Sequence, residues 1–125
     1  MKVVKTYKEP RWLALRHRVL VRDKYIDQYW SRYGRFISAD MVHHIFPVKD
    51  FPEYCWEEWN LISVNRKTHE LLHDRENDEL TDMGKEILIR TARRNNIDVP
   101  AWVLKEKRKD NRRYFYGKGA MGSKN

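Results

Sequence analysis

Apolar residues recur at helical spacing near the start of the chain. Trp12, Leu15 and Val19 share one face of a helix, arginines occupy the other faces, and Pro10 suits a first helical turn. This pattern predicts a helix over residues 10–22. Similar periodicity and helix-start residues predict three further helices, over residues 67–75, 81–95 and 100–110.

Two short segments between these helices have the character of strands. Residues 36–42 alternate loosely between apolar and polar side chains, and residues 61–64 form a short apolar run. Residues 25–30 are predicted to be extended, residues 33–35 to form a turn, and the proline-containing, aromatic residues 45–58 to form an irregular packed loop. Helices flanking short strands predict an α+β fold.

The length of 125 residues and a hydrophobic content of 41% favour one small domain with a modest core. Within it we predict a basic N-terminal arm and helix over residues 1–36, a central core over residues 37–75, and C-terminal helices with a basic tail over residues 76–125. The single cysteine, Cys55, excludes an internal disulfide and a multi-cysteine zinc site. No segment approaches the ~20 apolar residues of a membrane span, so we expect a cytoplasmic protein without a membrane partner.

The net charge of +8 is unevenly distributed. Residues 1–36 carry ten Lys and Arg against three Asp and Glu, a net charge of +7. Residues 37–83 have a net charge of −7, and residues 84–125 a net charge of +8. Two basic flanks around an acidic centre suit a polyanion bound at the edges and a cation bound in the middle, although solvated charged faces would give the same count.

Four of the five histidines fall within residues 43–73. His69 and His73 are four residues apart, so on a helix they would share a face, where such a pair can bind one divalent ion. His43 and His44 follow the predicted strand, and because neighbouring strand residues point to opposite faces, these two are not expected to do the same job. One could join the ion while the other, as a neutral imidazole, takes a proton from water. Structural roles for these histidines also stay open.

The string from Ala39 to Pro47, followed by Trp59–Val64 and then His69, resembles the HNH endonucleases, most closely their small phage and prophage members. Two adjacent histidines, an Asn–Leu pair and a histidine nine residues after the asparagine carry the resemblance. The histidine layout is also similar to that of DNA-cleaving colicins. The resemblance covers about residues 37–75 and implies a ββα-metal finger, in which a helix crosses two short strands, with further helices flanking it.

The resemblance implies a role for each matching residue. His44 matches the general base that activates the attacking water, and Asn60 matches the asparagine that holds the loop and orients this base. His43, His69 and His73 match the ligands of one divalent ion, and three imidazoles leave positions on that ion open for phosphate oxygens. Imidazole-rich sites suit Zn²⁺, Ni²⁺ or Co²⁺, and Mg²⁺ and Mn²⁺ are the alternatives for activity in a cell.

The chain departs from the family pattern at the structural zinc, which many members hold with two Cys-x-x-Cys pairs. The corresponding positions are Asp27 and Trp30 upstream, and Asn65 and Thr68 just before His69. We therefore predict a finger without a zinc ribbon. Aromatic packing is expected to stabilise it instead, with these candidates: Trp30, Phe51, Tyr54, Trp56 and Trp59.

Together the resemblance and the charge distribution predict a metal-dependent DNA endonuclease, a phosphodiester hydrolase of phage or prophage origin. DNA is the expected partner, and phage packaging proteins are further candidates. Two alternatives stay open: a module that binds DNA without cutting it, and an interaction domain that metal merely stabilises. The basic residues expected to contact DNA are Arg11, Arg16, Arg18, Arg22, Arg93, Arg94, Lys107, Arg108, Arg112 and Arg113.

Overall fold

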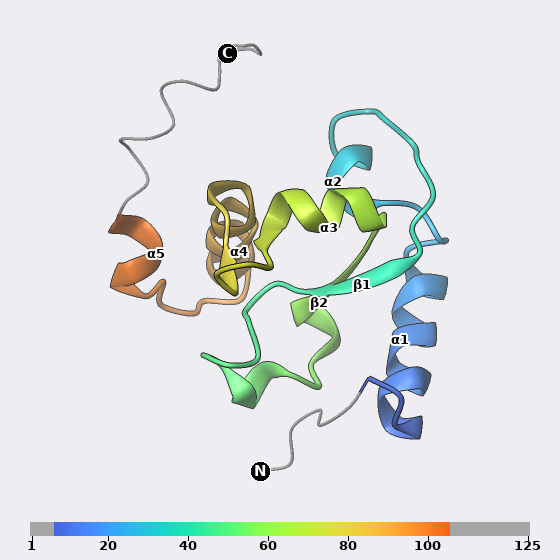
Figure 1. Cartoon of the computed structure of the whole chain (residues 1–125), viewed down its shortest axis with the longest axis horizontal. Helices are drawn as coiled ribbons and strands as arrows, with labels where there is room; N and C mark the ends of the chain where they lie inside the picture. The colour runs from blue at the N-terminus through green and yellow to red at the C-terminus, as the bar shows by residue number, and fades with distance from the viewer. Residues whose placement is uncertain (1–6, 106–125) are drawn as a thin grey trace. The chain divides into compact units, whose positions relative to one another are not determined.

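The computed structural model describes residues 7–105 of the chain. The chain divides into two compact units, Met1–Thr81 and Asp82–Asn125. The second unit contains α4 (Asp82–Arg94) and α5 (Ala101–Lys105). The first unit (Figure 1) contains, in order, α1 (Pro10–Arg22), α2 (Gln28–Ser31), β1 (Met41–His44), η1 (Pro52–Tyr54), η2 (Glu58–Asn60), β2 (Leu61–Val64), α3 (Arg66–Leu72), β3 (His73–Asp74) and β4 (Glu79–Leu80).

The centre of the first unit is an antiparallel pair formed by β1 and β2, in which Met41 lies opposite Val64 and His44 opposite Leu61. Both α1 and α3 pack against this pair. Side chains alternate along β1, so Val42 packs with the buried residues of α1 while His43 points toward α3. The two strands and α3 therefore form the predicted ββα finger, and α1 covers its other face.

The core of this unit comes from the predicted apolar face of the first helix. Trp12, Leu15 and Val19 are buried together with Cys55 and Leu61. A second cluster fills the loop between β1 and β2, where the fully buried Phe46 meets the following rings: Phe51, Tyr54 and Trp59. Phe46 contacts these rings edge-on at centroid distances of 5.0 to 5.8 Å, a favoured aromatic arrangement. Aromatic packing in this loop is confirmed for Phe51, Tyr54 and Trp59.

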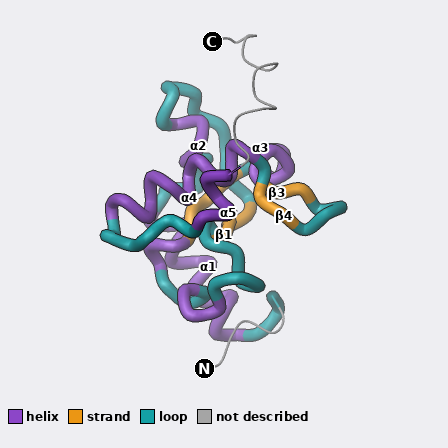
Figure 2. Tube along the Cα trace, turned by 90° about the vertical axis from the view of Figure 1, so that its left-hand side faces the viewer, coloured by secondary structure: helices purple, strands orange, loops and turns teal. Residues whose placement is uncertain are grey.

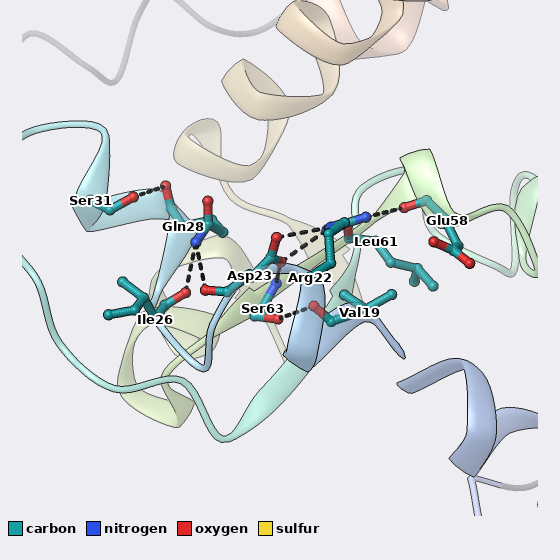
Figure 3. Close-up of polar contacts among 9 residues, drawn as sticks. All are labelled: Val19, Arg22, Asp23, Ile26, Gln28, Ser31, Glu58, Leu61 and Ser63. Carbon is teal, nitrogen blue, oxygen red and sulfur yellow. Dashed lines mark hydrogen bonds and ion pairs between the residues drawn. The ribbon is translucent and has the colours of Figure 1, made fainter. Parts of the chain in front are cut away.

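Polar contacts fasten the end of α1 to β2 (Figure 3). The carboxylate of Asp23 accepts from the backbone N–H of Ser63 at 3.0 Å and from two nitrogens of Arg22 at 2.9 Å. Arg22 also donates to the carbonyls of Glu58 and Leu61. This network fixes where the helix ends relative to the finger.

Several predicted elements are confirmed, and others are wrong in detail. The helix over residues 10–22 and the strand over residues 61–64 are as predicted. The first strand is Met41–His44 rather than 36–42, because the preceding residues find only a single bridge, between Ile26 and Ser38. Within the predicted extended segment 25–30, the side chain of Asp27 accepts from the N–H of Trp30 and starts α2.

The predicted helix over residues 67–75 ends early, at Leu72. His73 is extended and pairs with Leu80 in the β3–β4 hairpin, which Figure 2 shows beyond the end of α3. The sequence pattern did not predict this hairpin. Its turn is stabilised by Asp74, whose side chain accepts from the N–H groups of Glu76 and Asn77.

The second unit begins with α4, which closely matches the predicted helix over residues 81–95. Asn96 follows it with a φ of 55°, a left-handed conformation that ends helices. α4 packs with α5, and Leu88, Ala92 and Val103 are buried. The last predicted helix is confirmed as far as Lys105, and the remainder of its range lies outside the described residues. None of the helices among residues 7–105 has the length and apolar character needed to cross a membrane.

Candidate active site

The two adjacent histidines of β1 point to opposite faces of the finger, as their neighbouring positions in a strand require. His43 faces α3, where its ring centroid is 5.2 Å from that of His69. His44 faces α1, where it stacks on Trp12 at 5.2 Å. The expected separation of the two side chains is therefore confirmed.

His43 is a buried imidazole with an unused nitrogen. The residue is 2% exposed, and its Nε2 has no hydrogen-bond partner among the described residues. Burial lowers the pKa of His43 well below its usual value, and the neighbouring His69, His44 and His73 lower it further. The ring is consequently neutral near pH 7, which is the form that binds metal ions.

His69 and His73 lie beside each other, although not for the reason predicted. Their rings stack at 5.7 Å with an interplanar angle of 17°. Only His69 is on α3; His73 is the first residue of β3, so the premise of one helical face is wrong. Burial lowers the pKa of His69, and His73 and Arg75 add to this effect.

An acidic side chain orients His73. Its Nε2 lies 3.2 Å from Oδ1 of Asp78, and its Nδ1 is buried without a hydrogen-bond partner among the described residues. Asp78 in turn contacts Lys49, whose Nζ is 3.4 Å from Oδ2 and donates to the Asp78 carbonyl at 2.7 Å. A carboxylate on one ring nitrogen leaves the other available as a ligand, an arrangement common around protein metal ions.

The three imidazoles fit a divalent ion in chemistry and approximate spacing. Two imidazoles on one tetrahedral ion have ring centres roughly 5 Å apart, close to the 5.2 and 5.7 Å separations found here. As the side chains stand, no three His, Cys, Asp or Glu residues of the described part of the chain converge on one point. The nitrogens Nε2 of His43 and Nδ1 of His73 are nevertheless buried without hydrogen-bond partners among the described residues, as expected of atoms that serve as metal ligands.

His44 has a defined hydrogen-bond partner, in contrast to His43. Its Nε2 is 3.0 Å from the carbonyl oxygen of Cys55. A carbonyl oxygen only accepts, so Nε2 carries the proton and the neutral ring keeps its lone pair on Nδ1. Burial lowers the pKa of His44, and the bond to Cys55 opposes this shift. His44 is thus a neutral imidazole with a fixed tautomer.

Asn60 is fully buried and acts on the loop that carries this carbonyl. Its Oδ1 accepts from the N–H of Phe46 at 2.7 Å, and its Nδ2 donates to the carbonyls of Phe46 and Tyr54 at 3.2 Å. Tyr54 immediately precedes Cys55. Asn60 therefore reaches His44 through the backbone at Cys55, since the structure gives no hydrogen bond between the two side chains.

A cavity of about 670 Å³ connects the two sides of the strand. Its lining includes all four histidines of the cluster, namely His43, His44, His69 and His73. Arg16 and Lys49 also line it, together with the carboxylates of Asp40 and Asp78, the second of which pairs with Lys49. The cavity brings imidazole nitrogens, a neutral base and two cationic side chains into one space, a combination suited to a phosphate ester.

The positions of the missing zinc ligands hold a hydrogen-bonded carboxylate instead. Asp27 is completely buried, and its Oδ1 accepts from the N–H of Trp30 while its Oδ2 accepts from the N–H of Asn65, both at 2.8 Å. Asn65 caps α3 by accepting from the N–H of Lys67. Asp27 thus connects the two segments that a zinc ion joins in the resembled family, a role that the aromatic hypothesis did not assign.

The predicted DNA-contacting residues fall in different environments. Arg22 is committed to Asp23 and two backbone carbonyls, so its place in the structure indicates a structural role. Arg11 lies over the ring of Trp56, Arg16 donates to the carbonyl of Asp40, and Arg18 pairs with the exposed Glu58. Arg93 and Arg94 are exposed at the end of α4. The remaining predictions lie outside the described residues: Lys107, Arg108, Arg112 and Arg113.

Comparison with known proteins gives one solved structure that resembles about half of the chain. No family model and no curated protein matches the chain. The chain is similar to the crystal structure of an HNH endonuclease from the deep-sea thermophilic bacteriophage GVE2, determined with a manganese ion. The identity is 26%, the TM-score is 0.50, and the match covers 51% of this chain and 70% of the phage protein. With the ordered motif and the ββα finger, this likeness supports the assignment of the chain to the HNH endonuclease family.

Proposed function

We propose that the protein is a metal-dependent DNA endonuclease that hydrolyses phosphodiester bonds. The observation that carries the proposal is that the two adjacent histidines of β1 have different environments. His43 contacts His69 on one face of the strand, and His44 has a fixed tautomer on the other. The GVE2 phage enzyme, an HNH endonuclease determined with manganese, supports the same reaction class. Its origin also supports a phage or prophage source for this chain, acting in the cytoplasm of a bacterial host.

In the proposed reaction, His44 accepts a proton from the attacking water at Nδ1, while Nε2 stays bonded to Cys55. The water oxygen forms the new bond to phosphorus, and the bond from phosphorus to one bridging ester oxygen breaks, so that this oxygen keeps the electron pair and takes a proton from solvent. Asn60 keeps the Cys55 segment in place, so the imidazole holds its orientation as it becomes charged. The low pKa of His44 keeps the ring unprotonated, and ready to act, near pH 7.

His43, His69 and His73 would hold one divalent ion, which when bound neutralises phosphate charge as a Lewis acid. Their imidazole nitrogens suit Zn²⁺, Ni²⁺ or Co²⁺, and the manganese in the phage enzyme favours Mn²⁺ among the harder ions. Arg16 and Lys49, at the cavity, would bind the phosphate oxygens. We assign non-specific backbone contacts to Arg11, Arg18, Arg93 and Arg94, with the basic residues beyond 105 as further candidates.

The test is incubation of supercoiled plasmid with the full chain and each of several divalent ions, with His44→Ala in parallel. We expect metal-dependent nicking by the wild-type protein and loss of nicking in the variant. Retarded plasmid without nicking under every ion would instead support a DNA-binding module that does not cleave.

A further inference from the structure

An exposed turn between α2 and β1 combines aromatic and basic side chains. All residues from Arg32 to Phe36, which we call the aromatic–basic turn, are exposed. Phe36 is 73% exposed and Tyr33 is 55% exposed. Isolated exposed apolar residues are ordinary, but two large rings and two guanidinium groups within five residues form a compact amphipathic surface.

This turn has a regular hydrogen-bonded conformation. The N–H groups of Tyr33 and Arg35 both donate to the carbonyl of Trp30, at 2.9 and 3.0 Å. Gly34 has a φ of +82°, a left-handed conformation that a glycine adopts without steric cost. The buried Tyr29 lies below, 5.6 Å from the ring of Tyr33. A turn shaped in this way loses little conformational entropy when it binds.

The turn is also anchored to the finger itself. Asp27 connects the start of α2 to the N–H of Asn65, and the side chain of Asn65 donates to the carbonyl of Ser38 just after the turn. The N–H of Asp27 donates to the carbonyl of Ile37 at 2.8 Å. These hydrogen bonds fix the position of the turn relative to β1 and α3, the elements that carry His43, His44 and His69.

The positive charge of the segment favours a polyanion as its partner. Arg32 and Arg35 are the only charged residues between Gln28 and Ala39, so no carboxylate of this segment opposes a polyanion. The Arg35 guanidinium lies over the Trp30 ring at 4.7 Å, which orients it without neutralising its charge. Cations that flank an exposed aromatic ring complement the phosphates and bases of a nucleic acid.

The turn also lies within reach of a duplex bound at the histidines. Phe36 precedes His44 by eight residues, which span at most about 29 Å when fully extended. One turn of B-form DNA is about 34 Å long. A duplex whose phosphate occupied the cavity could thus extend to the aromatic–basic turn.

We propose that the aromatic–basic turn is a second DNA contact, in which Phe36 inserts between base pairs and Arg32 and Arg35 hold the adjacent phosphates. Apolar side chains that enter base steps unstack and kink the duplex, and flanking cations compensate the backbone charge. The choice of DNA as the partner rests on the proposed function. The contact deepens that function, because a kinked duplex would present a distorted phosphodiester to the cavity.

The test measures binding of the full chain to a labelled duplex by fluorescence anisotropy, with EDTA present to prevent cleavage. Phe36→Ala should weaken binding by roughly tenfold or more, as expected for loss of one base-stacking ring, while Phe36→Trp should bind like wild type. Replacing both Arg32 and Arg35 by glutamine should lower the log–log salt dependence by about 0.9 for each phosphate that the side chains no longer neutralise. Val21→Ala removes another exposed apolar side chain, from α1, and serves as the control.

A second readout reports insertion directly. A duplex containing 2-aminopurine should brighten on binding wild-type protein, because the base unstacks, and should stay dim with Phe36→Ala. Equal affinity and equal fluorescence for wild type and a folded Phe36→Ala variant would overturn the inference while plasmid nicking still stood. Phe36-dependent binding without any nicking would instead refute the endonuclease and leave the DNA contact intact.

Discussion

The two faces of β1 give its two histidine side chains opposite hydrogen-bonding environments. On the α3 face, His43 is fully enclosed, and its Nε2 and the Nδ1 of His73 have no hydrogen-bond partners among the described residues. On the α1 face, His44 is stacked on Trp12 and bonded to the Cys55 carbonyl. One face keeps nitrogen lone pairs unused, and the other fixes a proton on a chosen nitrogen.

This difference shows how a strand can separate two functions at neighbouring positions. Buried polar atoms without partners cost about 1–3 kcal/mol each, so a protein retains them where a ligand offsets that cost. A hydrogen bond to a carbonyl, in contrast, prevents Nε2 of His44 from accepting a proton or binding an ion. The α3 face is therefore suited to metal binding and the α1 face to proton transfer.

The largest expected effect is that of His44→Ala on cleavage. Loss of a general base should lower kcat on the order of 10²–10⁴-fold, because water then attacks without proton transfer to a positioned group. Plasmid cleavage under saturating metal measures this directly. His17→Ala, which removes an exposed histidine of α1, is the matched control and should cleave like wild type.

Metal affinity should be retained in the same variant, since His44 belongs to the other face of the strand. Calorimetric titration with Mn²⁺ or Zn²⁺ checks this expectation. A His44→Ala protein that had lost its metal as well as its activity would contradict the separation of the two faces.

The second effect concerns the α3 face. His69→Ala should weaken divalent-metal binding by well over 100-fold, because a ligand contributes more than the ~10–100-fold typical of residues around the ligands. The measurement is the same titration, supported by the rise in Tm that metal gives to the wild-type protein. Unchanged affinity in a folded His69→Ala variant would remove His69 from the proposed site.

Asn60→Ala tests the support of the α1 face. The substitution leaves the buried N–H and carbonyl of Phe46 unpaired, and the Tyr54 carbonyl keeps only its bond from the N–H of Glu57, so we expect a loss of about 2–4 kcal/mol in the free energy of unfolding. Because the Cys55 segment is then less well held, kcat should also fall by about tenfold, a smaller effect than loss of the base itself. Denaturation curves and cleavage assays below the Tm separate the two effects, and an unchanged kcat would confine Asn60 to a purely structural role.

The sequence allowed much of this site to be predicted because its residues follow local rules. Alternation along a strand separated His43 from His44, and apolar spacing defined the buried face of α1. His69 and His73 were correctly predicted to lie close together, but for the wrong reason. The β3–β4 hairpin, rather than a helical turn, places His73 beside His69. The turn residues Asp74 and Asn77 are typical of such a hairpin and were the available signal.

Long-range pairing explains what the sequence could not provide. Asp27 and Asn65 are 38 residues apart, and nothing local indicates that one buried carboxylate joins them where the resembled family uses zinc. Likewise, Arg22 contacts Asp23 and the Leu61 carbonyl only because α1 packs against β2, which its own sequence does not indicate. Arginine on a helix surface suggests a phosphate contact until its partners are known.

The smallest expected effect comes from Asp78, which supports the α3 face from the hairpin. Its carboxylate lies 3.2 Å from Nε2 of His73, and a negative charge there makes Nδ1 a better electron donor to a metal. Asp78→Asn removes the charge while suiting the left-handed backbone at this position, where φ is 54°.

We expect Asp78→Asn to lower metal affinity about tenfold, at the lower end for such residues, because the Asp78 side chain is 66% exposed and water screens its charge. Glu79→Gln, an exposed acidic neighbour in β4, is the control for charge alone and should bind metal like wild type. The titration used for His69→Ala also measures the metal affinity of these two variants. Equal losses of affinity in Asp78→Asn and Glu79→Gln would mean that Asp78 acts only through the overall negative charge of the hairpin.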